Sequence, residues 1–253
     1  RIRLPTFTVL ALSVVSFVLL QSLAVPVLSE TQRYYETTQR TTTWVLTGYL
    51  LSASICTPLL GRLGDALGKR LMLIVTLSIL TAGSTMAALA PSIEWLIIAR
   101  VVQGVGGGVL PLSFGIARDN FGRHTTAAIS MLSSLTAVGV AAGIVIAGPI
   151  VETLGYPWLY WLPAITTAVA ALAAARFIPE AGARTPSRLP LVPALLLTVW
   201  LIALLLGLSE GNEWGWRSTP VLALFGVALL VAVAWARIES RVAVPLIDMR
   251  MMR

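Results

Sequence analysis

The fold is decided by the stretch Gly61-Arg62-Leu63-Gly64-Asp65-Ala66-Leu67-Gly68-Lys69-Arg70, a short charged segment between two long apolar runs. These runs cover residues 44–60 and 71–90. A helix rises 1.5 Å per residue, so each run can cross most or all of a hydrocarbon core roughly 30 Å thick. We therefore expect a tight basic turn at a membrane face, with a transmembrane helix on each side.

The composition indicates an integral membrane protein. Of the 253 residues, 57% are hydrophobic and only 11% are charged, which is far from the balance of a soluble domain. Apolar segments of about 20 residues favour helices over a barrel, whose strands would alternate apolar and polar residues. The single cysteine, Cys56, lies inside an apolar run, so we expect neither a disulfide framework nor a cysteine metal site.

The apolar segments of the sequence predict eight transmembrane spans. We place them at 7–28, 43–60, 71–90, 94–115, 125–151, 157–178, 190–209 and 219–237. The first six form an N-terminal bundle over residues 1–178. A proline-containing cytoplasmic linker at 179–189 then leads to two accessory spans within 190–237, which are followed by a cytoplasmic tail at 238–253.

The loop charges predict the orientation. With the N-terminus in the cytoplasm, fourteen basic residues fall in inside loops and three, Arg33, Arg40 and Arg217, in outside loops. We therefore attribute the net charge of +7 to the basic inside loops that orient the protein in the membrane, and we expect no nucleic acid partner. Because the basic residues are almost all arginine and Ala, Leu and Val dominate, we expect a bacterial cytoplasmic (inner) membrane protein that contacts membrane lipid.

Arg100 is the strongest single candidate for a functional residue, because it lies about six residues, roughly 9 Å, inside the fourth span. Gln103, Gly104, Gly107 and Gly108 follow it at helical spacing, which places charge, amide and bare backbone on one face. A buried guanidinium costs at least about 2.5 kcal/mol, so it needs a partner or a purpose. The alternative is an arginine that extends to the outer interface.

Other polar residues in the spans are candidates for a substrate cavity with Arg100 and Gln103. They are Gln21, Ser22, Thr47 and Ser54. Each of them could equally be a group that hydrogen-bonds between packed helices. We expect no catalytic residues, because the only histidine, His124, lies in a loop beside Arg123 and forms no catalytic constellation.

The fifth span carries a helix-packing pattern. Gly139, Gly143 and Ala147 recur at four-residue spacing, and Gly148-Pro149 follows. Small residues at this interval let another helix approach closely, and the proline bends the outer end.

Three stretches carry a family resemblance. The segment from Gly61 to Arg70 resembles the loop between helices two and three of the major facilitator superfamily. Leu96 to Gly106 resembles its helix-four motif, and Gly139 to Pro149 is similar to the helix-five motif of its antiporters. The two accessory spans after the sixth span resemble the extra pair of helices in the fourteen-span drug:proton antiporter branch of this superfamily.

The resemblance implies proton-coupled efflux of drug-like or amphipathic small molecules by alternating access, with no cofactor beyond the proton gradient. It covers the first eight of fourteen helices, so the expected partner is a missing C-terminal bundle, or a second copy in a homodimer. The alternatives are a facilitator or symporter for a polar or anionic solute, and a non-transporting half-size membrane protein.

One departure from the resemblance concerns the proton site. Helix one of that branch carries an acidic residue some nine positions before a proline, and alignment on Pro26 puts Phe17 there. The spans hold no deep Asp or Glu, since Glu94, Glu152 and Glu210 lie near outer ends. Proton coupling would then use a carboxylate near Arg100, a group of the missing half, or another mechanism.

The basic loop has an expected mechanical role. In the family it latches the two halves together, which implies this role for Gly61, Arg62, Gly64, Asp65, Gly68, Lys69 and Arg70. Gly61, Asp65 and Gly68 share a face if the helix ends continue into the loop. Asp65 could then meet a helix N-terminus or an arginine such as Arg118 or Arg123.

Overall fold

The structure is a computed structural model that describes residues 4–179 and 191–239. Within these ranges the chain forms helices and no strand, which confirms the all-helical membrane fold. Seven helical stretches are long and apolar enough to cross a membrane. One of them, Ile93–Leu154, has 62 residues and is interrupted by short 3-10 segments.

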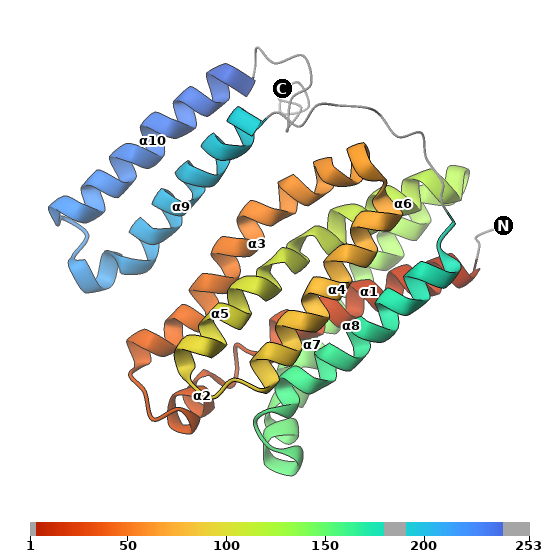
Figure 1. The fold of residues 1–253 in the computed structure, drawn as a ribbon, viewed down its shortest axis with the longest axis horizontal. Coiled ribbons are helices and arrows are strands. Elements are labelled where there is room, and N and C mark those ends of the chain that lie inside the picture. The colour runs from red at the N-terminus through yellow and green to blue at the C-terminus, as the bar shows by residue number, and fades with distance from the viewer. Residues whose placement is uncertain (1–3, 180–190, 240–253) are drawn as a thin grey trace. The chain divides into compact units, whose positions relative to one another are not determined.

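The N-terminal unit contains most of the described helices (Figure 1). In chain order they are α1 (Leu4–Leu23), α2 (Leu28–Tyr34), α3 (Gln39–Leu67), α4 (Lys69–Ala88), α5 (Ile93–Gly104), η1 (Val105–Gly108), α6 (Val109–Phe121), η2 (Gly122–His124), α7 (Thr125–Leu154) and α8 (Trp158–Phe177).

The segment expected as a turn is mostly helix, which corrects the sequence interpretation. Residues 61–67 form the last two turns of α3, and α4 begins at Lys69. Gly68 alone lies between the two helices, at φ 109°, a conformation that favours glycine. Hydropathy marks where an apolar run stops, whereas helical hydrogen bonding continues into charged residues, so α3 extends beyond the expected 43–60 at both ends.

The fourth expected span is not one regular helix. The glycines of Val105–Gly108 form a 3-10 turn between α5 and α6, and Gly122, at φ 49°, precedes α7. The short helix α2 also has no counterpart among the expected spans, because seven residues with a polar composition carry no membrane signal. Side chains define two helix starts: Thr38 accepts a hydrogen bond from the Thr41 amide at 3.2 Å, and Ser92 accepts one from the Trp95 amide at 3.4 Å.

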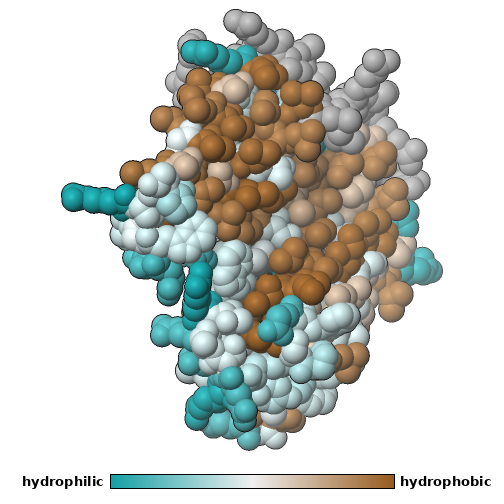
Figure 2. All heavy atoms as spheres, turned by 60° about the vertical axis from the view of Figure 1, so that its left-hand side comes forward, coloured by the Kyte–Doolittle hydropathy of each residue, from teal (hydrophilic) through white to brown (hydrophobic). Residues whose placement is uncertain are grey.

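Helices far apart in the sequence pack side by side in this unit. The most extensive contacts in this unit join α4 to α8, α3 to α5, and α1 to both α7 and α8. Fully buried leucines such as Leu10, Leu73, Leu77 and Leu112 fill the space between them. On the face of the chain that Figure 2 draws, apolar side chains cover much of the surface and polar ones gather toward the lower part of the view, as expected for helices whose sides face lipid.

The remaining described helices, α9 (Leu191–Trp214) and α10 (Thr219–Glu239), pack against each other in a second unit. The division between the units falls at residues 184 and 185, inside the expected linker 179–189. Residues 180–190 of that linker and 240–253 of the expected tail lie outside the described residues. Within the second unit, the rings of Trp200 and Trp235 lie 6.1 Å apart, so Trp200 takes part in packing between the two helices.

Candidate functional site

Arg100 lies in the interior of the N-terminal unit, with no exposed surface. Its Nε donates to the carbonyl oxygen of Val45 at 3.3 Å, and its Nη1 donates to Oε1 of Gln103 at 2.8 Å. The guanidinium carbon also lies 4.5 Å from the ring centroid of Tyr49. The arginine therefore joins α5 to α3 and does not extend to the interface, which was the alternative interpretation.

Gln103 continues this contact to a third helix. Its Nε2 donates to the Ser84 hydroxyl on α4 at 3.1 Å, and both side chains are buried. Space for the amide comes from Gly83, where a Cβ would lie 3.0 Å from Gln103 Cγ. The Arg100 centre, as we call Tyr49, Ser84, Arg100, Gln103 and the Val45 carbonyl, thus connects α3, α4 and α5.

Two donors of the Arg100 centre have no hydrogen-bond partner in the described structure. They are Arg100 Nη2 and the Tyr49 hydroxyl. A buried donor without a partner costs about 1–3 kcal/mol, so the centre can gain free energy by binding an acceptor such as a carboxylate, a small anion or water. No described Asp or Glu forms an ion pair with Arg100, so its charge is held by neutral groups.

Glycines after Arg100 bring its helix against α3. A Cβ on Gly104 would overlap Ser52 and lie 2.8 Å from the Tyr49 carbonyl oxygen. One on Gly107 would overlap Thr57 and lie 2.9 Å from the Ala53 carbonyl oxygen, and one on Gly108 would contact Leu60. These three glycines therefore lie at a close contact between helices.

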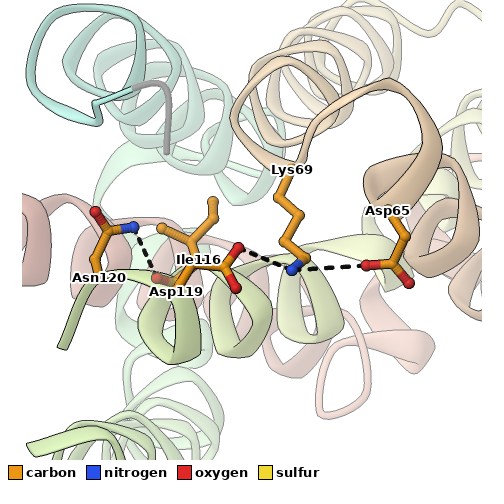
Figure 3. Close-up of polar contacts among 5 residues, drawn as sticks. All are labelled: Asp65, Lys69, Ile116, Asp119 and Asn120. Carbon is orange, nitrogen blue, oxygen red and sulfur yellow. Dashed lines mark hydrogen bonds and ion pairs between the residues drawn. The ribbon is translucent and has the colours of Figure 1, made fainter. Parts of the chain in front are cut away.

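A second polar cluster lies at the junction of α3 and α4 (Figure 3). Lys69 Nζ lies 2.8 Å from Asp119 Oδ2 and 3.6 Å from Asp65 Oδ1. Its aliphatic stem passes over Gly115 of α6, where a Cβ would lie 2.8 Å from Lys69 Cδ. We call Asp65, Lys69, Gly115 and Asp119 the Lys69 bridge; it ties the start of α4 to α6.

The Lys69 bridge corrects the expected partner of Asp65. Among the described residues its ion pair is with Lys69, not with Arg118 or Arg123. Asp119 and Gly115 were missed, although their four-residue spacing places both on one face of a helix.

The rest of the predicted latch segment also contacts neighbouring helices. Arg70 donates to the Ala175 carbonyl near the end of α8. A Cβ on Gly64 would overlap Leu112, and one on Gly61 would lie 3.8 Å from Pro111 Cβ, so both glycines face α6.

The other predicted cavity residues do not join the Arg100 centre as a group. Ser22 is buried against α7 and donates to the Val18 carbonyl at 2.9 Å. Gln21 is exposed, whereas Thr47 and Ser54 are half-buried on α3. Tyr49 and Ser84 were missed, because a tyrosine or serine in an apolar span carries no signal that it contacts an arginine on another helix.

The residues of α7 that were predicted to pack against another helix differ in what they contact. A Cβ on Gly143 would overlap Ser22 Oγ, and one on Gly139 would lie 3.1 Å from Val18 Cγ1, so both glycines pack against α1. The prediction is wrong for Gly148, which packs against no other helix, because nothing lies within 4 Å of the position that its Cβ would occupy. Pro149 lies within α7, and Thr153 Oγ1 donates to its carbonyl at 2.7 Å.

Four tyrosines cluster at the end of the unit that carries α2. The Tyr34 and Tyr156 rings stack with centroids 4.5 Å apart, and Tyr35 and Tyr160 meet Tyr156 edge-on. The Tyr156 hydroxyl donates to Thr31 Oγ1 at 3.0 Å, which attaches α2 to the segment between α7 and α8. Burial raises the pKa of the Tyr156 hydroxyl, so it stays protonated at neutral pH.

The described residues include no group of three or more His, Cys, Asp or Glu side chains that could hold a metal ion. Membrane-length helices that enclose a charged residue are typical of polytopic transporters, because an intramembrane charge faces the bundle interior or a substrate path. Fold and site are therefore those of a polytopic membrane protein with a charged residue in its interior.

Comparison with known proteins identifies the family. Residues 10–236 match the profile of the Major Facilitator Superfamily, and the chain belongs to that family. It is 29% identical over 210 residues to the multidrug transporter protein MdtP of Bacillus subtilis, covering 82% of this chain and 39% of that protein. It is 31% identical over 225 residues to a multidrug resistance protein B homolog of Mycobacterium tuberculosis, covering 86% and 41%.

Solved structures agree on the fold. The human organic anion transporter MFSD10 has a TM-score of 0.62 at 17% identity, covering 93% of this chain and 71% of that one. The peptide-transporter-family protein PepTSo has a TM-score of 0.63 at 14% identity, covering 91% and 51%. The chain spans about two fifths of the length of the two multidrug relatives above.

Proposed function

We propose that the protein containing this chain exports small drug-like or amphipathic compounds by alternating access, in exchange for protons. The family and the names of the curated relatives, which include multidrug and antibiotic resistance proteins, support export. The single structural observation that carries the proposal is the buried Arg100 centre with its two unpartnered donors.

In this proposal, the Arg100 centre is the coupling element of the N-terminal bundle. Its guanidinium is fixed by Val45, Gln103 and Tyr49 on two helices, which leaves Nη2 and the Tyr49 hydroxyl for an acceptor that changes between states. A carboxylate at these donors would be stabilised in its ionised form, and a change in its distance would change its proton affinity. That carboxylate is proposed to lie outside the eight spans, since Phe17 occupies the helix-one position.

The proposed partner of this bundle is a C-terminal bundle of the same protein, or a second copy of the chain. In either case the two bundles would rock around a midplane cavity, the arrangement of transporters built from repeats. The Lys69 bridge, with the rest of the segment from Gly61 to Arg70, would serve as the latch of the N-terminal half.

Everted membrane vesicles from cells that express the complete reading frame test the proposal. ATP-driven acidification of the vesicle lumen should drive uptake of ethidium, and an uncoupler should abolish this uptake. Accumulation without any dependence on the proton gradient would exclude antiport and favour a facilitator.

The Arg100→Ala variant tests the assigned role of the centre. We expect loss of gradient-driven uptake with normal membrane insertion, because the coupling charge is removed. Arg118→Ala, at an exposed arginine of α6, is the matched control and should transport normally. Undiminished uptake by Arg100→Ala would remove the role of the Arg100 centre.

A further inference from the structure

A groove separates α2 from the last turns of α7. Its larger part has a volume of about 440 Å³, with Pro26, Val27 and Glu30 on one side and Ile144, Val145 and Glu152 on the other. A second hollow of about 330 Å³ adjoins it and adds Tyr34 and Tyr156. Glu30, Arg33 and Val151 border both, so the two hollows are adjacent, and together we call them the α2 groove.

Gly148 keeps the α2 groove open. It lines the larger part, and nothing lies within 4 Å of the position that its Cβ would occupy. A methyl group at this position would therefore meet no atom of another helix in the described structure. The apolar wall beside it is accessible, with Ile144 49% and Val145 72% exposed.

The charge at the α2 groove is negative. Glu30 is paired with Arg33, whereas Glu152 forms no ion pair with a described residue. The surrounding end of the unit carries the acidic residues Glu30, Glu36, Glu94 and Glu152 against Arg33 and Arg40. Such an excess raises the local concentration of cations.

An aromatic surface borders the same depression. One face of the Tyr34 ring stacks on Tyr156, and Tyr34 remains 53% exposed. Tyrosine faces attract organic cations, and more strongly where part of the water is excluded. The apolar wall and the Glu152 carboxylate line the larger hollow, and the Tyr34 ring borders the adjoining one. Each hollow is within the size range of sites for small molecules.

We propose that the α2 groove binds an amphipathic organic monocation, with Glu152 as its counter-charge, Tyr34 as its aromatic contact and the Val145 side of α7 as its apolar floor. The inference rests on the proposed function only in identifying this cation with an exported compound. It assigns a peripheral site, separate from the Arg100 centre, on the expected outer side of the membrane.

Equilibrium binding of tetraphenylphosphonium to the complete purified protein in nanodiscs tests the site. We expect Glu152→Gln to weaken this binding about fivefold, as removal of one partly exposed ion pair does. Glu94→Gln, which neutralises an exposed glutamate of the same end outside the groove, should leave it unchanged. Gly148→Leu should weaken it about tenfold by filling the space.

Tetraphenylborate, which has the same shape and the opposite charge, is the matched probe. Its binding should not weaken in Glu152→Gln. Equal effects of Glu152→Gln and Glu94→Gln, no effect of Gly148→Leu, or no saturable binding would each overturn the site. Because binding is measured without transport, Arg100→Ala should retain it, so failure of the site and failure of the export proposal give different results.

Discussion

Arg100 shows why a buried charge is tolerated here without a carboxylate. Its insertion costs about 2.5–3.5 kcal/mol on translocon scales. Two hydrogen bonds from a charged group contribute about 1.5–3 kcal/mol each, and the Tyr49 ring adds a cation–π contact. Neutral partners on α3 and α5 therefore offset the insertion cost, and the charge stays available to another group.

The Lys69 bridge allows a test by charge reversal. Lys69→Glu or Asp119→Lys alone should each destabilise the protein by about 1 kcal/mol, because like charges then lie at contact distance. Combining both should recover only part of this loss, since the carboxylate introduced at position 69 would also face Asp65, which is 3.6 Å from Lys69 Nζ in the native chain. Thermal unfolding of the purified single and double variants measures these changes in stability. Full recovery in the double variant would show that Asp65 is not coupled to the bridge.

Three charged side chains and one amide of the two clusters were predictable at this scale, whereas the charged Asp119 was not predicted. Arg100, Gln103, Asp65 and Lys69 stand out because polar groups are rare in this composition and costly in lipid. Ser84, Tyr49 and Gly115 could not be found in this way, because serine, tyrosine and glycine are common in transmembrane helices. Their role depends on which residue of another helix they face.

At the scale of elements, glycines decide how closely helices approach. The α5–η1–α6 segment meets α3 through Gly104, Gly107 and Gly108, where added side chains would overlap α3. Gly139 and Gly143 do the same for α7 against α1. Gly148 belongs to the same predicted packing motif but has no neighbour, so the motif alone did not distinguish a packing glycine from one that borders a groove.

Alanine substitutions at two glycines should therefore have opposite effects. Gly107→Ala should destabilise the protein by about 1–3 kcal/mol, because its methyl group meets the α3 backbone at Ala53. Gly148→Ala should be neutral or stabilise by up to about 1 kcal/mol, since it adds helix propensity without a clash. Thermal unfolding in one detergent compares them; destabilisation by Gly148→Ala would contradict an open groove at this position.

The short helix α2 depends on tertiary contacts for its position. Tyr156→Phe removes one hydroxyl and should lower the free energy of unfolding by about 1 kcal/mol, because the Thr31 and Tyr160 hydroxyls lose their shared partner. Amide exchange in residues 28–34 should then accelerate about fivefold. Tyr34→Phe is the control, as the Tyr34 ring stacks on Tyr156 and its hydroxyl has no described hydrogen bond. Equal exchange in both variants would show that the Tyr156 hydroxyl does not hold α2.

At the scale of the whole molecule, charge is segregated between the two ends of the N-terminal unit. The end with Lys69 carries the described basic residues Arg62, Lys69, Arg70, Arg118, Arg123 and Arg176 against Asp65 and Asp119. The end with α2 has the acidic excess described for the groove. The positive-inside rule predicts that the Lys69 end faces the cytoplasm.

Thiol labelling tests this orientation. In a Cys56→Ser background, a membrane-impermeant maleimide should label Glu36→Cys in intact cells and should label Arg123→Cys only after the membrane is opened. Both positions are exposed and lie in short segments between α-helices, so accessibility alone should not distinguish them. Labelling of Arg123→Cys in intact cells, with protection of Glu36→Cys, would reverse the proposed topology.

The sequence by itself determined the membrane class, the helical fold and the family. Those properties follow from local signals, namely the length of apolar runs, the position of basic residues and motifs confined to one segment. Helix ends were less predictable, because residues 61–67 are charged and yet helical.

Only the tertiary structure decided which residues meet. Helical periodicity places Arg100, Gln103 and the glycines on one face, but it does not fix the axial position or rotation of α3 and α4 against that face. Those depend on the sum of many side-chain contacts between helices. For this reason the Val45 carbonyl, Ser84 and Tyr49 at the Arg100 centre, Asp119 at Lys69, and the open position of Gly148 in the α2 groove are properties of the assembled bundle.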